Sequence, residues 1–168
     1  MDCVKILSPC GILGYGFPPE SLKAGLADEP DAIVVDAGST DAGPHKLGAK
    51  TAIVSKTAAK KDLSLLISAA YEKNIIISSA GGSGGKEHID WTLKIIREIF
   101  SERNFAPVKT AVIWADIPND VIIEKIAQHK VCPLGTNVPE LTAHTLETCT
   151  GVVAQMGAEP FIKALDEG

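Results

Sequence analysis

A glycine-rich string is the part of the sequence best suited to chemistry. It reads Ser79-Ala80-Gly81-Gly82-Ser83-Gly84-Gly85 and lies between a predicted strand and a predicted helix. Glycine lets backbone N–H groups approach a ligand closely, and a helix N-terminus adds a partial positive charge. The string therefore predicts a binding loop for a phosphate or carboxylate group, formed by Ser79, Gly81, Gly82, Ser83, Gly84 and Gly85. The alternative is a tight strand-to-helix turn that holds no ligand.

This string matches no standard nucleotide-binding motif. A Walker loop requires glycine at the position of Ala80 and Ser or Thr at the position of Glu87. The dinucleotide fingerprint, when it is read from Gly82, fails because Glu87 replaces its last glycine. Neither an NTP site nor a dinucleotide site is therefore predicted.

Two carboxylates bracket a second loop. Asp36 and Asp41 flank the small polar residues Gly38-Ser39-Thr40, directly after a predicted buried strand. Carboxylates at a strand end can act as acid and base, hold a substrate hydroxyl or bind a divalent cation. We expect Asp36 and Asp41 to be catalytic, with Ser39 and Thr40 binding substrate. The alternative is that each aspartate caps its own turn.

Other candidates lie beside these loops. His45 lies in a predicted irregular stretch, 37–50, and histidine is the residue type that most often transfers protons at neutral pH, so His45 is predicted to carry a proton unless it is a solvated surface residue. Cys10, Asp116 and Gln155 follow three other predicted strands and are secondary candidates. Cys10 is either a nucleophile or a small buried thiol. His88 and Asp90 have a His-x-Asp spacing, which is weak evidence for a metal.

These candidates need elements that bring them together, and the sequence predicts an alternation of strands and helices. Strands are expected at 4–8, 32–36, 74–78, 110–114, 151–154 and, with a weaker pattern, 130–133. Helices are expected at 20–26, 57–73, 88–103, 139–147 and 159–165 and after Pro118-Asn119-Asp120. The apolar runs in 31–36 and 109–116 are continuous, as in central parallel strands. The predicted fold class is α/β: a three-layer, mostly parallel sheet with helices on both faces, Rossmann-like but without a dinucleotide fingerprint.

Such a sheet would gather the candidates at one edge, because ligands of open α/β sheets bind beyond the carboxyl ends of the strands. The chain has 168 residues, of which 45% are hydrophobic and 22% charged, and this composition excludes disordered, fibrous and membrane-spanning classes. A chain of this length buries roughly 70% of its unfolded surface, so residues 1–168 are expected to form a single domain.

Charge and cysteine content restrict the partners. The net charge is -5 and no basic run exceeds Lys60-Lys61, which predicts no nucleic-acid partner and no membrane partner. Four cysteines without a CxxC pair, and the absence of a recognisable targeting segment, predict a reducing cytoplasmic setting.

Several strings together resemble the N-terminal part of the acyclic terpene utilisation family. They are Ile6-Leu7-Ser8-Pro9-Cys10-Gly11-Ile12-Leu13-Gly14-Tyr15-Gly16-Phe17, Val35-Asp36-Ala37-Gly38-Ser39-Thr40-Asp41, Ser79-Ala80-Gly81-Gly82-Ser83-Gly84-Gly85 and Val153-Ala154-Gln155-Met156-Gly157. The resemblance implies bacterial catabolism of branched carboxylic acids as coenzyme A thioesters. Since family members continue beyond the position of Gly168, it also implies an N-terminal domain or a subunit of a larger enzyme, completed by a partner subunit or a C-terminal domain.

The expected function is therefore lyase- or hydratase-type acid/base chemistry on a small carboxylate or an acyl-CoA. Coenzyme A would enter as part of the substrate, a divalent cation is a possible cofactor, and a homo- or hetero-oligomer is expected. The alternative is a non-catalytic anion-binding module or subunit that completes a partner's active site.

Overall fold

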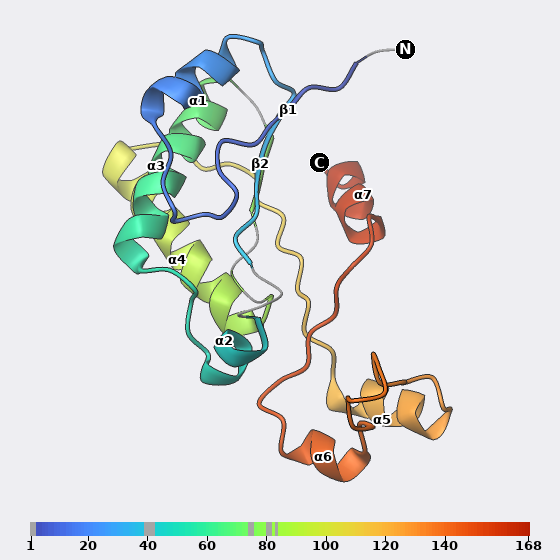
Figure 1. The fold of residues 1–168 in the computed structure, drawn as a ribbon. Coiled ribbons are helices and arrows are strands. Elements are labelled where there is room, and N and C mark those ends of the chain that lie inside the picture. Colours follow the sequence, from blue (N-terminus) through green and yellow to red (C-terminus); the bar gives the residue numbers. More distant parts are fainter. Residues whose placement is uncertain (1–2, 39–42, 74–75, 80–81, 83) are drawn as a thin grey trace.

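A small parallel sheet and a set of helices make up the computed structural model, which describes residues 3–38, 43–73, 76–79, 82 and 84–168 (Figure 1). The elements of this part of the chain are, in order, β1 (Ile6–Leu7), α1 (Pro19–Leu26), β2 (Ala32–Val35), α2 (Gly43–Ala49), α3 (Lys56–Lys73), β3 (Ile76–Ser79), α4 (Lys86–Arg103), α5 (Asn119–Ala127), α6 (Ala143–Glu147) and α7 (Glu159–Asp166).

The sheet has the strand order β1-β2-β3, and both pairs of strands are parallel. Ile6 pairs with Ala32, and Val35 pairs with Ser79. Alternate residues of a strand point to opposite faces, and in β2 Ile33 and Val35 are buried whereas Ala32 and Val34 are half-buried. The parallel arrangement brings the carboxyl ends of the strands to one edge of the sheet.

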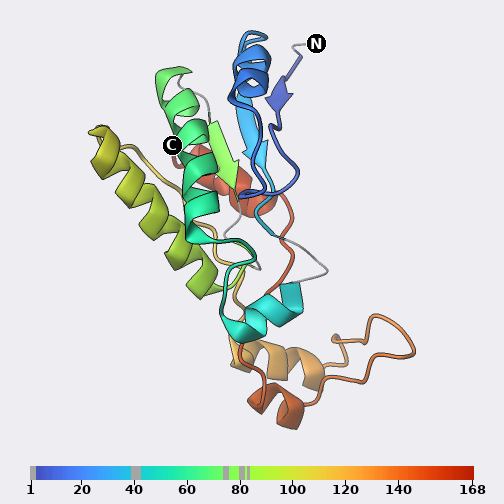
Figure 2. The same ribbon diagram turned by 60° about the vertical axis from the view of Figure 1, so that its left-hand side comes forward.

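Helices α1, α3 and α4 lie on one side of this sheet, and α3 and α4 run side by side in both views (Figure 1, Figure 2). The core forms between them. It contains Leu63 and Leu66 of α3, Ile95 and Ile99 of α4, and Ile33 of β2, none of which is more than 1% exposed. The apolar stripe predicted for α3 therefore faces the core, as its spacing indicates. In α4 the buried residues lie one position away from the predicted stripe, whose Ile96 and Phe100 are only half-buried against the core.

The predicted fold class, a three-layer Rossmann-like α/β sheet with helices on both faces, is wrong. In the described part of the chain far more residues lie in helices than in strands, and the sheet is small. Among them no strand forms at 110–114, 130–133 or 151–154, where Val153 makes only an isolated antiparallel bridge with Asp116. On the other side of the sheet in Figure 1 lies α7, which buries none of its residues.

The physical reason is that β-branched runs indicate an extended backbone but do not specify a partner. The segment from Val108 to Trp114 forms no regular element, and these two residues are 52% and 44% exposed. Its continuous apolar run was therefore misinterpreted as the sign of a central strand.

Most of the predicted helices are confirmed, with boundaries that shift by a few residues. The largest shift is at α6, which begins at Ala143 with Thr142 as its N-cap rather than at Pro139. The irregular stretch predicted at 37–50 is wrong over Gly43–Ala49, which forms α2. Pro44 lies in the first turn of α2, where proline is tolerated because the first N–H groups have no helical partner.

Candidate functional site

The loops that follow β2 and β3 touch each other. A Cβ atom built on Gly38 would lie 2.5 Å from the carbonyl oxygen of Gly82, a distance that real side chains do not adopt. Gly82 has a φ of +100°, a conformation that favours glycine. The two sequence strings singled out for chemistry therefore meet through their glycines at the carboxyl edge of the sheet.

Asp36 directly follows β2 and fixes the start of the loop. Its side chain is exposed, and Oδ1 accepts a hydrogen bond from the backbone N–H of Gly38 at 2.8 Å. Its backbone carbonyl accepts a bond from the N–H of Leu13 at 2.7 Å. Asp36 thus forms the turn cap that the sequence left open as an alternative, while its carboxylate remains in contact with solvent.

The second loop leads directly into α4. Gly85 is the N-cap and supplies no side-chain hydrogen bond, and Gly84 has a φ of +80°. A Cβ atom on Gly84 would lie 3.2 Å from Cβ of Ala115, so the segment Trp114–Asp116 packs against the loop. The backbone N–H of Lys86 donates to Oδ1 of Asp116 at 3.2 Å. A carboxylate of the chain itself thus binds at the N-terminus of α4, where the helix dipole favours negative charge.

Lys86 adds a cation to this edge. Its Nζ lies 2.6 Å from Oδ2 of Asp90 and 5.0 Å from the centre of the Trp114 ring. The hydrogen bond and charge of Asp90, with smaller contributions from the charges of Glu87 and Asp116, raise the pKa of Lys86. Sequence reasoning missed Lys86, although its position directly after the glycine string was a usable signal.

The buried side chain of His88 packs against the glycine loop at Gly82. The residue is 2% exposed, its Nε2 lies 2.9 Å from the carbonyl oxygen of Thr51, and its Cγ would lie 3.3 Å from a Cβ on Gly82. Within the described part of the chain no group of three or more His, Cys, Asp and Glu side chains is arranged to hold a metal ion. The ring of His88 therefore packs against the loop and bonds to the backbone, and the His-x-Asp spacing marks no metal cluster among the described residues.

Helix α2 also borders the site. A Cβ on Gly85 would lie 2.8 Å from Cδ1 of Leu47, and Nζ of Lys50 pairs with Oε1 of Glu87 at 2.9 Å. Both contacts hold α2 against the start of α4. His45 lies on α2, and its side chain is exposed.

The remaining candidates have varied positions. Ser79 is the last residue of β3, and Gln155 is exposed, two residues beyond the bridge at Val153. Cys10 is half-buried, and burial, followed by the negative charge of Asp62, raises the pKa of its thiol. The candidates outside the described residues are Ser39, Thr40, Asp41, Gly81 and Ser83.

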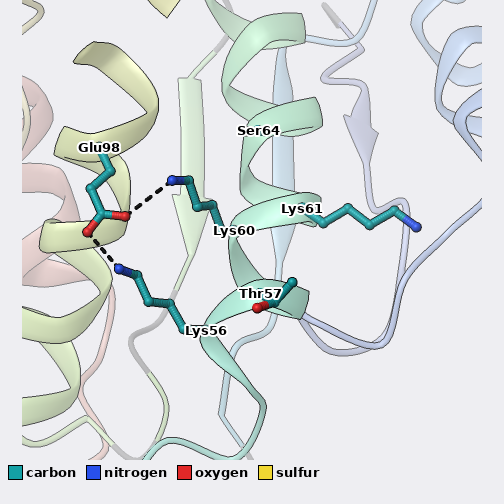
Figure 3. Close-up of a pocket in the computed structure, with 6 residues that line it drawn as sticks. All are labelled: Lys56, Thr57, Lys60, Lys61, Ser64 and Glu98. Carbon is teal, nitrogen blue, oxygen red and sulfur yellow. Dashed lines mark hydrogen bonds and ion pairs between the residues drawn. The ribbon is translucent and has the colours of Figure 1, made fainter. Parts of the chain in front are cut away.

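A surface pocket of about 360 Å³ lies elsewhere, between α3 and α4 (Figure 3). Lys56 and Lys60 point into it, and both bind Glu98, at 2.7 and 3.2 Å. Lys60 also binds Glu102 at 2.6 Å, whereas the side chain of Lys61 points away from Glu98. The charges of two lysines and two glutamates compensate one another here. The charged residues at this pocket therefore form an ion-pair network that joins α3 and α4 rather than an anion-binding site.

Comparison of the chain with protein-family models, with curated proteins and with solved structures gives no match. None of the helices in the described part of the chain has the length and apolar character needed to cross a membrane.

Proposed function

We propose that this chain is an enzyme, or the ligand-binding part of one, that performs lyase- or hydratase-type acid/base chemistry on a small carboxylate or an acyl-CoA. One observation carries the proposal: the turn at Asp36, the loop ending at Gly85 and the segment at Asp116 converge at the N-terminus of α4. The resemblance of the sequence strings to the acyclic terpene utilisation family supports the same substrate class.

In this proposal each group has a distinct role. The anionic part of the substrate binds at the loop that ends at Gly85, beside the ammonium of Lys86, and displaces the Asp116 carboxylate from the N–H of Lys86. Asp36 is held by Gly38 through Oδ1, so Oδ2 is the atom that would orient a substrate hydroxyl or take up a proton. Burial and the charge of Asp62 raise the pKa of the Cys10 thiol and disfavour its thiolate, so the proposal gives Cys10 no nucleophilic role. All four cysteines are free thiols, which supports a cytoplasmic setting.

Calorimetric titration with coenzyme A, acetyl-CoA and simple dicarboxylates tests the binding step. Lys86→Gln removes one charged hydrogen-bond donor from the site and should weaken binding about 10-fold, since such a bond is worth about 1.5 kcal/mol or more. Lys61→Gln removes the same charge from an exposed position on α3 and should leave the affinity unchanged. Equal weakening by both variants, or no heat from the unmodified chain with any ligand, would contradict the proposal.

Turnover tests the catalytic step. Asp36→Asn keeps an oxygen that can accept the Gly38 N–H, so the fold should remain intact while acid/base chemistry stops. A folded variant that turns over acyl-CoA as fast as the unmodified chain would remove Asp36 from the mechanism.

A second candidate function is a non-catalytic anion-binding subunit that completes the active site of a partner. The observation in its favour is the apolar surface of α7, where Phe161, Ile162 and Leu165 are 45%, 55% and 60% exposed. Exposed apolar groups of this kind are typical of surfaces that bind another protein. An isolated chain that binds the ligands but turns over no acyl-CoA would favour this candidate over the enzyme.

A further inference from the structure

We propose that Asp62, a residue of α3 outside the site, is a positioning residue that fixes the backbone of Asp36. The inference rests on the proposed function for the role of Asp36. The contacts that carry it are independent of that role. They run from the carboxylate of Asp62 through the loop that follows β1 to the carbonyl of Asp36.

The carboxylate of Asp62 is buried and bound to backbone. The residue is 1% exposed, and Oδ2 accepts hydrogen bonds from the N–H of Gly14 at 2.8 Å and from the N–H of Gly16 at 3.0 Å. A buried carboxylate is costly unless it is bonded, and bonds to an ionised acceptor are stronger than neutral ones. Asp62 therefore binds the loop tightly at two points.

The conformation of the loop is adapted to this carboxylate. Gly14 and Gly16 have φ values of +94° and +82°, and these let both N–H groups turn towards the same oxygen. A Cβ on Gly14 would lie 2.6 Å from Cγ2 of Val54, so the loop has no space for a side chain at that position. Backbone N–H groups gathered around an anion in this way form a concave binding site, which is occupied here by the chain's own aspartate.

The same loop holds the end of β2. Leu13 precedes Gly14 directly, its side chain is 2% exposed in the core, and its N–H donates to the carbonyl of Asp36 at 2.7 Å. The carbonyl of Asp36 is therefore fixed by Leu13, while its carboxylate is fixed by the N–H of Gly38. Asp62 is connected to Asp36 by a short path: it binds the N–H of Gly14, and the neighbouring Leu13 binds the carbonyl of Asp36.

The residue type at this position also calls for an explanation. Aspartate is unfavourable inside a helix and is rarely buried. Its neighbours on the buried face of α3 include Ala59, Leu63 and Leu66, which are fully apolar. A leucine at position 62 would satisfy the helix and the core, but it would leave the N–H groups of Gly14 and Gly16 without this partner.

The test compares Asp62→Ala with Leu66→Ala, a substitution on α3 that removes core packing but no hydrogen bond to the loop. In ¹H–¹⁵N NMR spectra, Asp62→Ala should shift the amide resonances of Leu13 and Gly38 and remove the hydrogen-exchange protection of the Leu13 N–H. Leu66→Ala should leave both closer to their original values. Asp62→Asn retains an oxygen acceptor and should restore most of the Leu13 protection. If Asp62→Ala does not fold, Asp62→Leu, which fills the buried position without an acceptor, is the measured variant, with the result expected of Asp62→Ala.

The outcomes separate this inference from the proposed function. Unchanged Leu13 and Gly38 resonances in a folded Asp62→Ala chain, or equal changes in Leu66→Ala, would overturn the positioning role. If the chain binds none of the carboxylates or coenzyme A compounds but Asp62→Ala still releases Leu13, the proposed function fails and the contact stands. If ligands bind, Asp62→Ala should lower their affinity more than Leu66→Ala does. An equal loss of affinity would mean that Asp62 acts only through the stability of the fold.

Discussion

The contact between the two strand-end loops can be probed by adding a single methyl group. Gly38→Ala places a Cβ 2.5 Å from the carbonyl oxygen of Gly82, whereas such contacts in real proteins are essentially never under 3.0 Å. The loops must therefore separate by at least about 0.5 Å, the difference between these two distances. Because the clash is with backbone, it is not relieved by rotating a side chain.

The expected cost follows from two opposing effects. Overpacking of this kind costs about 1–3 kcal/mol. Replacing glycine by alanine also restricts the unfolded chain, which stabilises the protein by about 0.4–1 kcal/mol. The net loss in the free energy of unfolding should be about 1–2 kcal/mol.

Gly11→Ala is the matched control, since a Cβ at position 11 has no atom within 4 Å. Urea denaturation at pH 7, analysed with the m-value held in common, should place Gly38→Ala below the unmodified chain and Gly11→Ala at or slightly above it. Equal stability of the two variants would refute the close approach of the loops. Gly38→Ala should also weaken ligand binding, because it displaces Gly82.

Three further predictions concern a thiol, an ion pair and a helix. Cys10 should react with iodoacetamide more slowly than the exposed Cys132 at pH 8, because burial and the charge of Asp62 raise its pKa and so reduce its thiolate fraction. Asp62→Asn removes that charge and should accelerate the reaction of Cys10, and no acceleration would contradict the charge effect. Bonds from Lys56 and Lys60 lower the pKa of Glu98, so its small stabilisation is present above the unfolded pKa and lost as the pH falls through the folded one. Urea denaturation of Glu98→Gln should therefore show a smaller loss of the free energy of unfolding at pH 3 than at pH 7, and an equal loss at both would exclude the ion pairs as its cause. Deleting residues 158–168 should change the free energy of unfolding by no more than about 0.5 kcal/mol, because α7 buries none of its residues, and a larger loss would show that it packs.

The helices were predictable because their signal is local. The apolar stripe that includes Leu63 and Leu66 repeats at helical spacing and faces the core. The short α2 was missed because Gly43, Pro44 and Gly48 are typical of loops. The error in fold class has a different origin: pairing of the segment at 110–114 depends on a partner strand, which its own residues do not specify.

The candidate site was predictable in part. The sequence indicated that the Asp36 loop and the glycine string lie at one edge of the sheet, and the contact of Gly38 with Gly82 bears out that pairing. It did not reveal Asp62, because an aspartate at one position of an amphipathic helix resembles a solvated residue until the loop at Gly14 is folded against it.

A ¹H–¹⁵N NMR titration of the chain with acetyl-CoA and with a dicarboxylate tests the central claim most directly. The account predicts that the amides of Gly38, Gly82, Gly84, Gly85 and Lys86 shift together and saturate with one dissociation constant. No shifts, or shifts confined to the pocket of Lys56, Lys60 and Glu98, would contradict it.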